Sequence, residues 1–204
     1  MITAIVLAAG ESKRFGRNKL IEPLLGKPMI RWTVEAAVNS IVDEVIVVLG
    51  FEAHKVRRVI EDLPCKFILN KNYSAGMSSS VKLGVKQVAG KSEAVVIIPG
   101  DCPLIDENSI NKVIEAFREK CLPIVIATYG GRRGHPILIS RELFDEVMKI
   151  SEKTFGLKYV IKKYESKIFH VEVDNPGILL DIDNPEDLRE AEKLALKGVS
   201  NTLM

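Results

Sequence analysis

Short apolar runs rich in β-branched residues alternate along this chain with longer amphipathic segments, and this alternation constrains the fold more than any other sequence feature. The apolar runs predict strands at residues 3–7, 44–49, 66–69, 94–98, 124–128, 136–139 and 167–173. The amphipathic segments predict helices at residues 28–39, 53–63, 79–88, 107–120, 141–150, 155–164 and 185–196. Most of the strands are apolar throughout, as is typical of strands that helices cover on both faces. The sequence therefore predicts an α/β fold, a three-layer sandwich with a mainly parallel sheet, whose ligands bind beyond the carboxyl ends of the strands.

The length of 204 residues predicts a single domain, residues 1–204, because domains usually contain about 100–200 residues. Hydrophobic residues make up 47% of the chain, enough for a core, which excludes the disordered and fibrous classes. The net charge is only +2, without a long run of one sign, so we expect no nucleic-acid partner. The apolar runs are shorter than the roughly 18 residues of a membrane helix, and no signal peptide is recognisable, so we expect no membrane partner. The 3 cysteines lack CxxC pairing, which argues against a disulfide framework or structural zinc and favours a cytoplasmic location.

The first predicted strand runs into the loop LAAGESKRFGRNKL, residues 7–20, which is rich in small and cationic residues. Small residues such as Gly10 let backbone N–H groups approach an anion, and the side chains of Arg14 and Lys19 add charge-assisted hydrogen bonds. The number of residues between Gly10 and Gly16 does not match a Walker A motif, and no Lys-Ser or Lys-Thr pair follows Gly16. The GxGxxG motif of dinucleotide-binding proteins is also absent. The loop therefore predicts phosphate binding outside the ATPase and NAD-binding patterns, with a solvated glycine-rich turn as the alternative.

Two further segments of the sequence carry aspartates at or near the end of an extended run. Asp101 stands in VVIIPGDCP, after an apolar strand, a position that suits Mg²⁺ bound together with substrate phosphates. Asp181 and Asp183 alternate along the extended segment LLDIDNP and so point to the same side, where they repel each other unless a cation lies between them. The alternative for Asp101 is a turn or a helix cap. The alternative for Asp183 is a turn or the N-cap of the helix that starts at Pro185, although Asn184 also suits an N-cap.

A run of serines opens a predicted helix in NKNYSAGMSSSVKLGV. Ser78, Ser79 and Ser80 follow Gly76, so their hydroxyls and the helix N-terminus present polar donors at one place. The alternative is that one serine caps the helix and the others are solvated. Asn70 ends the preceding strand, where an asparagine is as often a turn residue.

These motifs resemble, in the same order, those of the small nucleotidyltransferases that join a nucleoside triphosphate to a phosphorylated acceptor. LAAGESKRFGRNK is similar to their LAAGxSxRxGxxK signature, and GDCP to their metal-binding GDxP segment. GMSSSVKLG and LLDIDNPEDL resemble segments of the molybdenum cofactor cytidylyltransferases, in which threonine is common in place of Asn184. Phe15 stands where methionine is frequent, and Cys102 where glutamine is frequent; we interpret Cys102 as a packing residue. The resemblance implies the Rossmann-like nucleotidyltransferase fold, also called the nucleotide-diphospho-sugar transferase fold.

The resemblance also implies roles for individual residues. The implied nucleotide-binding residues are Leu7, Ala8, Ala9, Gly10, Ser12, Arg14, Lys19, Gly76, Ser78, Ser79, Ser80 and Gly100. Arg14, Lys19 and Asp101 are the implied catalytic residues, because they would neutralise the triphosphate and the charge of the transition state. Mg²⁺ is the implied cofactor, held by Asp101, Asp181 and, less firmly, Asp183.

A fifth segment, YGGRRGHPILI, is similar to the acceptor-side GGxxGxP segment of the cytidylyltransferase branch. It makes Arg132, Arg133 and His135 the expected acceptor-binding residues. Neighbouring side chains of an extended backbone point in opposite directions, so we expect one arginine to reach the acceptor, Arg133, with His135 on the same side. The alternative is a solvated basic turn.

Together these features predict the transfer of CMP from CTP to the terminal phosphate of molybdenum cofactor (molybdopterin), with release of pyrophosphate. CTP is expected rather than GTP, because LAAG is typical of the cytidylyl branch and LAGG of the guanylyl branch. The acceptor phosphate is the nucleophile, so no protein nucleophile is required. The alternatives are a transferase acting on a sugar phosphate or another phosphorylated acceptor, and a non-catalytic molybdenum cofactor chaperone, which would not need the metal carboxylates. A transient contact with a molybdoenzyme is a further expectation.

Overall fold

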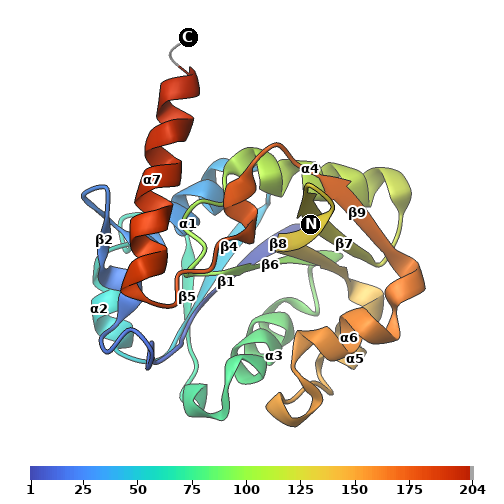
Figure 1. The fold of residues 1–204 in the computed structure, drawn as a ribbon. Helices are drawn as coiled ribbons and strands as arrows, with labels where there is room; N and C mark the ends of the chain where they lie inside the picture. The colour runs from blue at the N-terminus through green and yellow to red at the C-terminus, as the bar shows by residue number, and fades with distance from the viewer. Residues whose placement is uncertain (203–204) are drawn as a thin grey trace.

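The computed structural model describes the backbone of residues 1–202 and the side chains of residues 1–196. A twisted seven-stranded sheet forms its centre, and helices cover both faces (Figure 1). The strands of this sheet are β1 (Ile2–Ala8), β4 (Glu44–Leu49), β5 (Lys66–Leu69), β6 (Ala94–Pro99), β7 (Ile124–Tyr129), β8 (Arg132–Ser140) and β9 (Ile168–Glu172). A separate antiparallel pair consists of β2 (Pro23–Leu24) and β3 (Lys27–Pro28).

The order of strands across the sheet is β5-β4-β1-β6-β8-β7-β9. β1 pairs in parallel with β4 on one side and with β6 on the other, so these carboxyl ends lie at one edge. β8 runs antiparallel to both of its neighbours, whereas β9 is again parallel to β7. The expectation of a mainly parallel sheet is confirmed.

The helices divide into two layers. One face of the sheet carries α1 (Met29–Asn39), α2 (Ala53–Arg58) and α4 (Glu107–Lys120), and the other carries α3 (Met77–Val88), α5 (Phe144–Val147) and α6 (Leu157–Lys163) (Figure 1). The last helix, α7 (Pro185–Thr202), begins at the edge of the sheet that holds the end of β1 and points away from the body of the molecule (Figure 1). Short 3₁₀ turns are η1 (Lys19–Ile21), η2 (Tyr73–Ala75), η3 (Arg141–Leu143), η4 (Glu152–Thr154), η5 (Glu165–Lys167) and η6 (Pro176–Leu179).

Alternate residues of the central strands enter opposite cores. Along β1, Val6 packs into the core beneath α1 and α4, and its neighbour Ile5 into the core beneath α3. This arrangement explains why the central strands are apolar throughout, because both of their faces are buried. No helix in the described part of the chain is both long and apolar enough to cross a bilayer.

Several elements have bounds other than those expected; the backbone of α7, for example, continues to Thr202 instead of ending at residue 196. Three further differences have an identifiable local cause. The helix expected at 53–63 ends at Arg58, because tighter turns replace it: the N–H of Ile60 donates to the carbonyl of Arg57, three residues back, over 3.0 Å. The helix expected at 141–150 is a 3₁₀ turn followed by one short helix, because Arg141 is tied to the sheet: its backbone N–H donates to the carbonyl of Glu93, 2.8 Å away. The strand expected at 136–139 extends over Arg132–Ser140, so both arginines lie in a strand that pairs with β7, and the alternative of a basic turn is wrong.

Candidate functional site

The carboxyl ends of β1 and β6 bring the first loop and the Asp101 segment together. The backbone N–H of Gly100 donates to the carbonyl oxygen of Leu7 over 2.9 Å. A Cβ atom at position 100 would lie 2.8 Å from that oxygen, so glycine is needed for this approach. The C-terminal carboxylate segment joins the same edge, because the N–H of Ile182 donates to the carbonyl of Asp101 over 3.0 Å. Three segments that are distant in the sequence therefore meet at one point.

Lys19 lies at the centre of this meeting point. Its Nζ is 2.7 Å from Oδ2 of Asp101 and 2.9 Å from Oδ1 of Asp183. The second oxygen of Asp183 forms an ion pair with Arg14 at 2.7 Å. The lysine is placed by the first loop, in which Asn18 caps the η1 turn through a hydrogen bond to the N–H of Leu20. Two carboxylates and two cations thus form one alternating cluster.

Electrostatics keep Lys19 charged in this cluster. Its side chain is only 10% exposed, and this burial by itself would lower its pKa. The attraction and hydrogen bonds of Asp101 and Asp183 outweigh the burial and raise the pKa of Lys19 above its ordinary value. The ammonium group therefore carries its positive charge at neutral pH.

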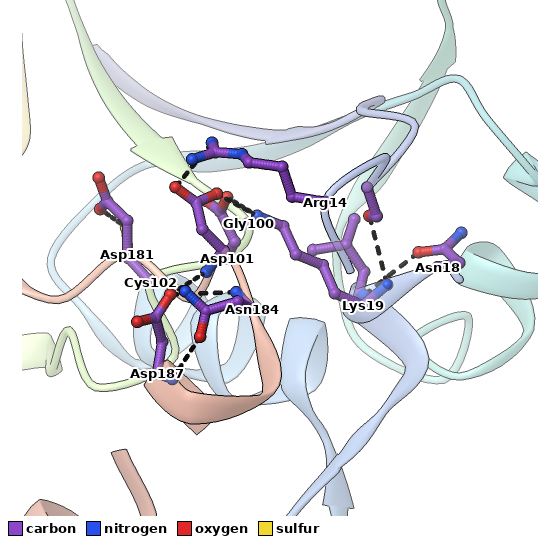
Figure 2. Close-up of polar contacts among 12 residues, drawn as sticks. Arg14, Asn18, Lys19, Gly100, Asp101, Cys102, Asp181, Asn184 and Asp187 are labelled. Carbon is purple, nitrogen blue, oxygen red and sulfur yellow. Dashed lines mark hydrogen bonds and ion pairs between the residues drawn. The ribbon is translucent and has the colours of Figure 1, made fainter. Parts of the chain in front are cut away.

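Asp183 is free to make these contacts because its neighbours cap α7. Oδ1 of Asn184 accepts from the N–H of Asp187 at 3.0 Å, and Oδ2 of Asp187 accepts in return from the N–H groups of Asp183 and Asn184. The expectation that Asn184 caps the helix is confirmed, and the alternative of a cap role for Asp183 is wrong (Figure 2).

Asp181 contacts a different group from Asp183. Its Oδ1 accepts a hydrogen bond from Sγ of Cys102 over 2.8 Å (Figure 2). Burial, followed by the nearby aspartates, raises the pKa of the Cys102 thiol well above its usual value, so the thiol keeps its proton and donates. Cys102 is therefore more than the packing residue that the sequence suggested. No spacing in the sequence connects it with Asp181, which is 79 residues further along the chain.

The carboxylates at this edge fit a divalent cation that arrives with its own phosphate ligands. Asp101 and Asp183 already converge on one cationic group, Nζ of Lys19. Among residues 1–196, no three His, Cys, Asp or Glu side chains are grouped closely enough to hold a metal by themselves. Mg²⁺ commonly takes one or two carboxylates and completes its shell with water and substrate phosphates, and this donor set matches that pattern.

The serine segment is held by side chains from two directions. Nδ2 of the buried Asn70 donates to Oγ of Ser79 over 2.8 Å and to Oγ of Ser80 over 3.0 Å. From the other side, Oε1 of Glu152 accepts from the N–H and the Oγ of Ser78, both at 2.8 Å. The alternative of one capping serine among solvated ones is wrong, since all three are bonded within the protein. The sequence did not single out Glu152, because it is 74 residues from Ser78.

A cavity of about 310 Å³ lies between the first loop and the serine segment. Seven of the expected nucleotide-binding residues line it, together with Asp101: Leu7, Ala9, Gly10, Ser12, Lys19, Gly76 and Ser80. The other five expected residues lie outside its wall. Ala8 is buried in the core, Gly100 is bonded to Leu7, and Arg14 reaches the cluster from an exposed position. Ser78 lines a second cavity, and Ser79 is bonded to Asn70. The sequence did not single out Tyr73 and Met77, which also line this cavity.

A second cavity of about 910 Å³ adjoins the first. The two share Leu7, Met77 and Pro99 in their walls. Arg133, His135 and Asp181 line the second cavity, whereas Arg132 is exposed and lies outside its wall.

Polar partners fix Arg133 at this cavity. Its Nε donates to Nε2 of His170 over 2.8 Å, and its guanidinium is paired with Glu165. Burial lowers the pKa of His135, although Asp181 and Asp101 act against this. The wall of the second cavity therefore holds Arg133 and His135 together with the carboxylates of Glu165 and Asp181.

Several known proteins resemble this chain over most of its length. The molybdenum cofactor cytidylyltransferase of Escherichia coli K12 is 25% identical over 193 residues, which are 94% of this chain and 96% of that protein. The crystal structure of Rv0371c from Mycobacterium tuberculosis H37Rv superimposes with a TM-score of 0.82 at 26% identity, covering 94% of this chain and 97% of that one. A structure of Rv0371c in complex with manganese has a TM-score of 0.78 at 25% identity, covering 94% and 98% of the two chains.

The bifunctional protein GlmU of Thermotoga petrophila is 38% identical over 118 residues, which are 57% of this chain. The match covers only 26% of the length of that relative. The family model described as the MobA-like NTP transferase domain matches residues 4–168, most of the chain. The chain therefore belongs to the MobA-like NTP transferase family.

Proposed function

We propose that this protein is a Mg²⁺-dependent nucleotidyltransferase that transfers CMP from CTP to the terminal phosphate of molybdenum cofactor and releases pyrophosphate. The observation that carries the proposal is the position of Lys19 between Asp101 and Asp183, in the wall of a cavity that adjoins a second cavity lined by Arg133 and His135. One cavity suits the triphosphate and the other the acceptor.

In the reaction, an oxygen of the acceptor phosphate attacks the α-phosphorus of the nucleotide. The new P–O bond forms as the bond to the β-phosphate breaks, and pyrophosphate leaves with its electron pair. Neither step needs a protein nucleophile, so positioning and charge stabilisation supply most of the rate. When bound, Mg²⁺ would neutralise phosphate charge and would be held by Asp101 together with Asp181 or, less firmly, Asp183.

The cationic side chains act on the developing negative charge. Lys19 is charged and buried, so its ammonium stabilises phosphate oxygens more strongly than an exposed lysine would. Arg14 lies at the exposed side of the same cluster and suits the leaving pyrophosphate. Backbone N–H groups near Gly10, together with the serine segment, would position the triphosphate and the nucleoside.

The acceptor assignment rests on the extent of the similarity. The E. coli molybdenum cofactor cytidylyltransferase matches nearly the whole chain, including the part that forms the second cavity, whereas the GlmU match covers little more than half. The manganese complex of Rv0371c supports a divalent cation. The aspartates favour an enzyme over a chaperone, since cofactor storage alone needs no metal ligands.

The test is pyrophosphate release from CTP, GTP, ATP and UTP, each measured with molybdopterin cofactor, with a hexose 1-phosphate and without acceptor. We expect release with CTP and molybdopterin cofactor, dependent on Mg²⁺, and little with the other combinations. A GTP preference would overturn the base assignment, and release with the hexose phosphate alone would overturn the acceptor. Tight binding of the cofactor without release from any nucleotide would show a chaperone instead.

A further inference from the structure

Phe155 combines an exposed aromatic ring with the left-handed backbone that ends the η4 turn, a position where glycine or asparagine is more usual. Its side chain is 79% exposed, and its backbone has φ = 61°, in the left-handed region that is unfavourable for residues with a Cβ atom. The ring therefore gains little from burial and is held in an unfavourable backbone conformation. Such features are more often found where a side chain meets a ligand than where it supports the fold.

The ring of Phe155 lies in the wall of the second cavity. Met77, which is 60% exposed, lines the same cavity. The sheet contributes Ile97, Ile126 and Ile137 to this wall, so much of it is apolar. A sugar would lose hydrogen bonds to water against such a surface, because its hydroxyls would find few partners there. A flat aromatic ring, in contrast, can stack on phenylalanine and bury its faces.

Polar groups at the same cavity match a heteroaromatic anion. Three cationic side chains line it, Arg133, Lys158 and Lys162, together with three carboxylates, Glu152, Glu165 and Asp181. Glu165 is paired with Arg133 and Glu152 is bonded to Ser78, so Lys158 and Lys162 are the side chains that supply positive charge for a phosphate. His135 lines it too, and its Nδ1 is buried without a hydrogen-bond partner within the described part of the chain. Buried polar atoms are nearly always paired, so an unpaired one in a cavity wall points to a missing ligand atom. A ring with nitrogen and carbonyl groups on its edge would provide that atom.

The loop that carries Phe155 is firmly attached. The N–H of Gly156 donates to the carbonyl of Ser151 over 2.9 Å, which closes the turn. Ser151 and Thr154 form a capping box, and Glu152 is bonded to Ser78 at the start of α3. The position of Phe155 is therefore fixed relative to the serine segment of the first cavity.

We propose that Phe155, together with Met77, forms a stacking wall that selects acceptors with a planar heteroaromatic ring, such as a pterin, over sugar phosphates. This inference rests on the proposed function and names the part of the site that sets acceptor class. The ring lies against Phe155, its edge meets His135, and its phosphate is drawn toward the cationic side chains.

The test is direct binding, measured by titration calorimetry without turnover. The probes are a pterin phosphate monoester, a hexose 1-phosphate and CTP, and the variants are Phe155→Ala and Tyr159→Ala. Tyr159 is a matched control, because it is a partly exposed aromatic residue on α6 outside the cavity wall. Stacking of a flat base on an aromatic side chain supports a loss of about tenfold or more in pterin phosphate affinity for Phe155→Ala. CTP and hexose phosphate affinity and the melting temperature should stay unchanged, and Tyr159→Ala should match the wild type throughout.

Three outcomes would overturn the inference: an unchanged pterin phosphate affinity in Phe155→Ala, an equal loss for the hexose phosphate, or a wild-type protein that prefers the hexose phosphate. The first would leave the proposed function intact, because pyrophosphate release from the wild type is measured separately. Selective loss of pterin binding in a protein that releases no pyrophosphate would support the stacking wall and refute the transferase.

Discussion

Replacing Lys19 with methionine removes the ammonium group that separates Asp101 from Asp183 and keeps most of the side-chain volume. At distances of 2.7 and 2.9 Å each ion pair is strong, but part of that energy only offsets the cost of taking the charges out of water. Breaking a fully buried pair costs about 3–5 kcal/mol. The side chains of Asp101 and Asp183 are 21% and 32% exposed, so water compensates in part, and we expect a loss of about 2–3 kcal/mol in the free energy of unfolding. For a chain of this size that corresponds to a fall of about 4–12 °C in Tm.

The pH dependence of this loss follows from the raised pKa of Lys19. A base whose pKa is higher in the folded state stabilises the fold at every pH below its ordinary value, here 10.5, and loses this effect as the pH rises through the folded-state pKa. The difference between wild type and variant should therefore be constant from pH 7 to 9 and shrink above pH 10.5.

The same substitution should make the nucleotide-free protein bind divalent metal more tightly, because two carboxylates then face each other without a cation. Thermal unfolding followed by circular dichroism, with and without Mn²⁺, measures both effects, and titration of free Mn²⁺ by electron paramagnetic resonance measures binding directly. Lys13→Met is the control, since Lys13 belongs to the same loop but is 79% exposed and pairs only with Glu11 among the ion pairs found. A Lys19→Met protein as stable as the wild type, with unchanged Mn²⁺ affinity, would refute the electrostatic reasoning.

Three further predictions concern turnover in the pyrophosphate assay. Asp101→Asn keeps the side-chain shape but removes one charge from the proposed metal site, so kcat should fall by at least about a hundredfold while the circular dichroism spectrum stays unchanged. Near-normal turnover at limiting Mg²⁺ would contradict the role of Asp101 as a metal ligand. Arg133→Ala should raise KM for the acceptor and spare KM for CTP, whereas the exposed Arg132→Ala should change neither; equal behaviour of the two variants would return this segment to a structural role. Asn70→Ala removes two hydrogen bonds to the serine segment, worth about 1 kcal/mol each, so KM for CTP should rise by about tenfold or more with little change in KM for the acceptor. An unchanged KM for CTP would show that the serines do not position the nucleotide.

Most of the fold could be predicted because its signals are local. The strands at 44–49 and 66–69 and the helix at 107–120 have the bounds that the sequence predicts, since a continuous apolar run or a 3.6-residue period is contained in the segment itself. The bounds were wrong where a partner strand decides the local structure. The strand expected at 136–139 begins already at Arg132, because Arg132 and Arg133 pair with Tyr129 and Thr128 of β7, and nothing in GGRRGHP signals that pairing.

The sequence by itself determined which chemical groups stand at the ends of the strands: a glycine-rich cationic loop after β1, a carboxylate after β6 and two more before α7. Only the tertiary structure decided which of them meet. Lys19 and Asp183 are 164 residues apart, and their contact depends on the strand order and on the cap that frees Asp183. Likewise, the bond of Cys102 to Asp181 and the exposed ring of Phe155 follow from how distant segments pack. The hydrophobic periodicity of the sequence indicates which face of a helix or strand is buried, but not which other element covers that face. The site could not be predicted in full because it is made of contacts between elements.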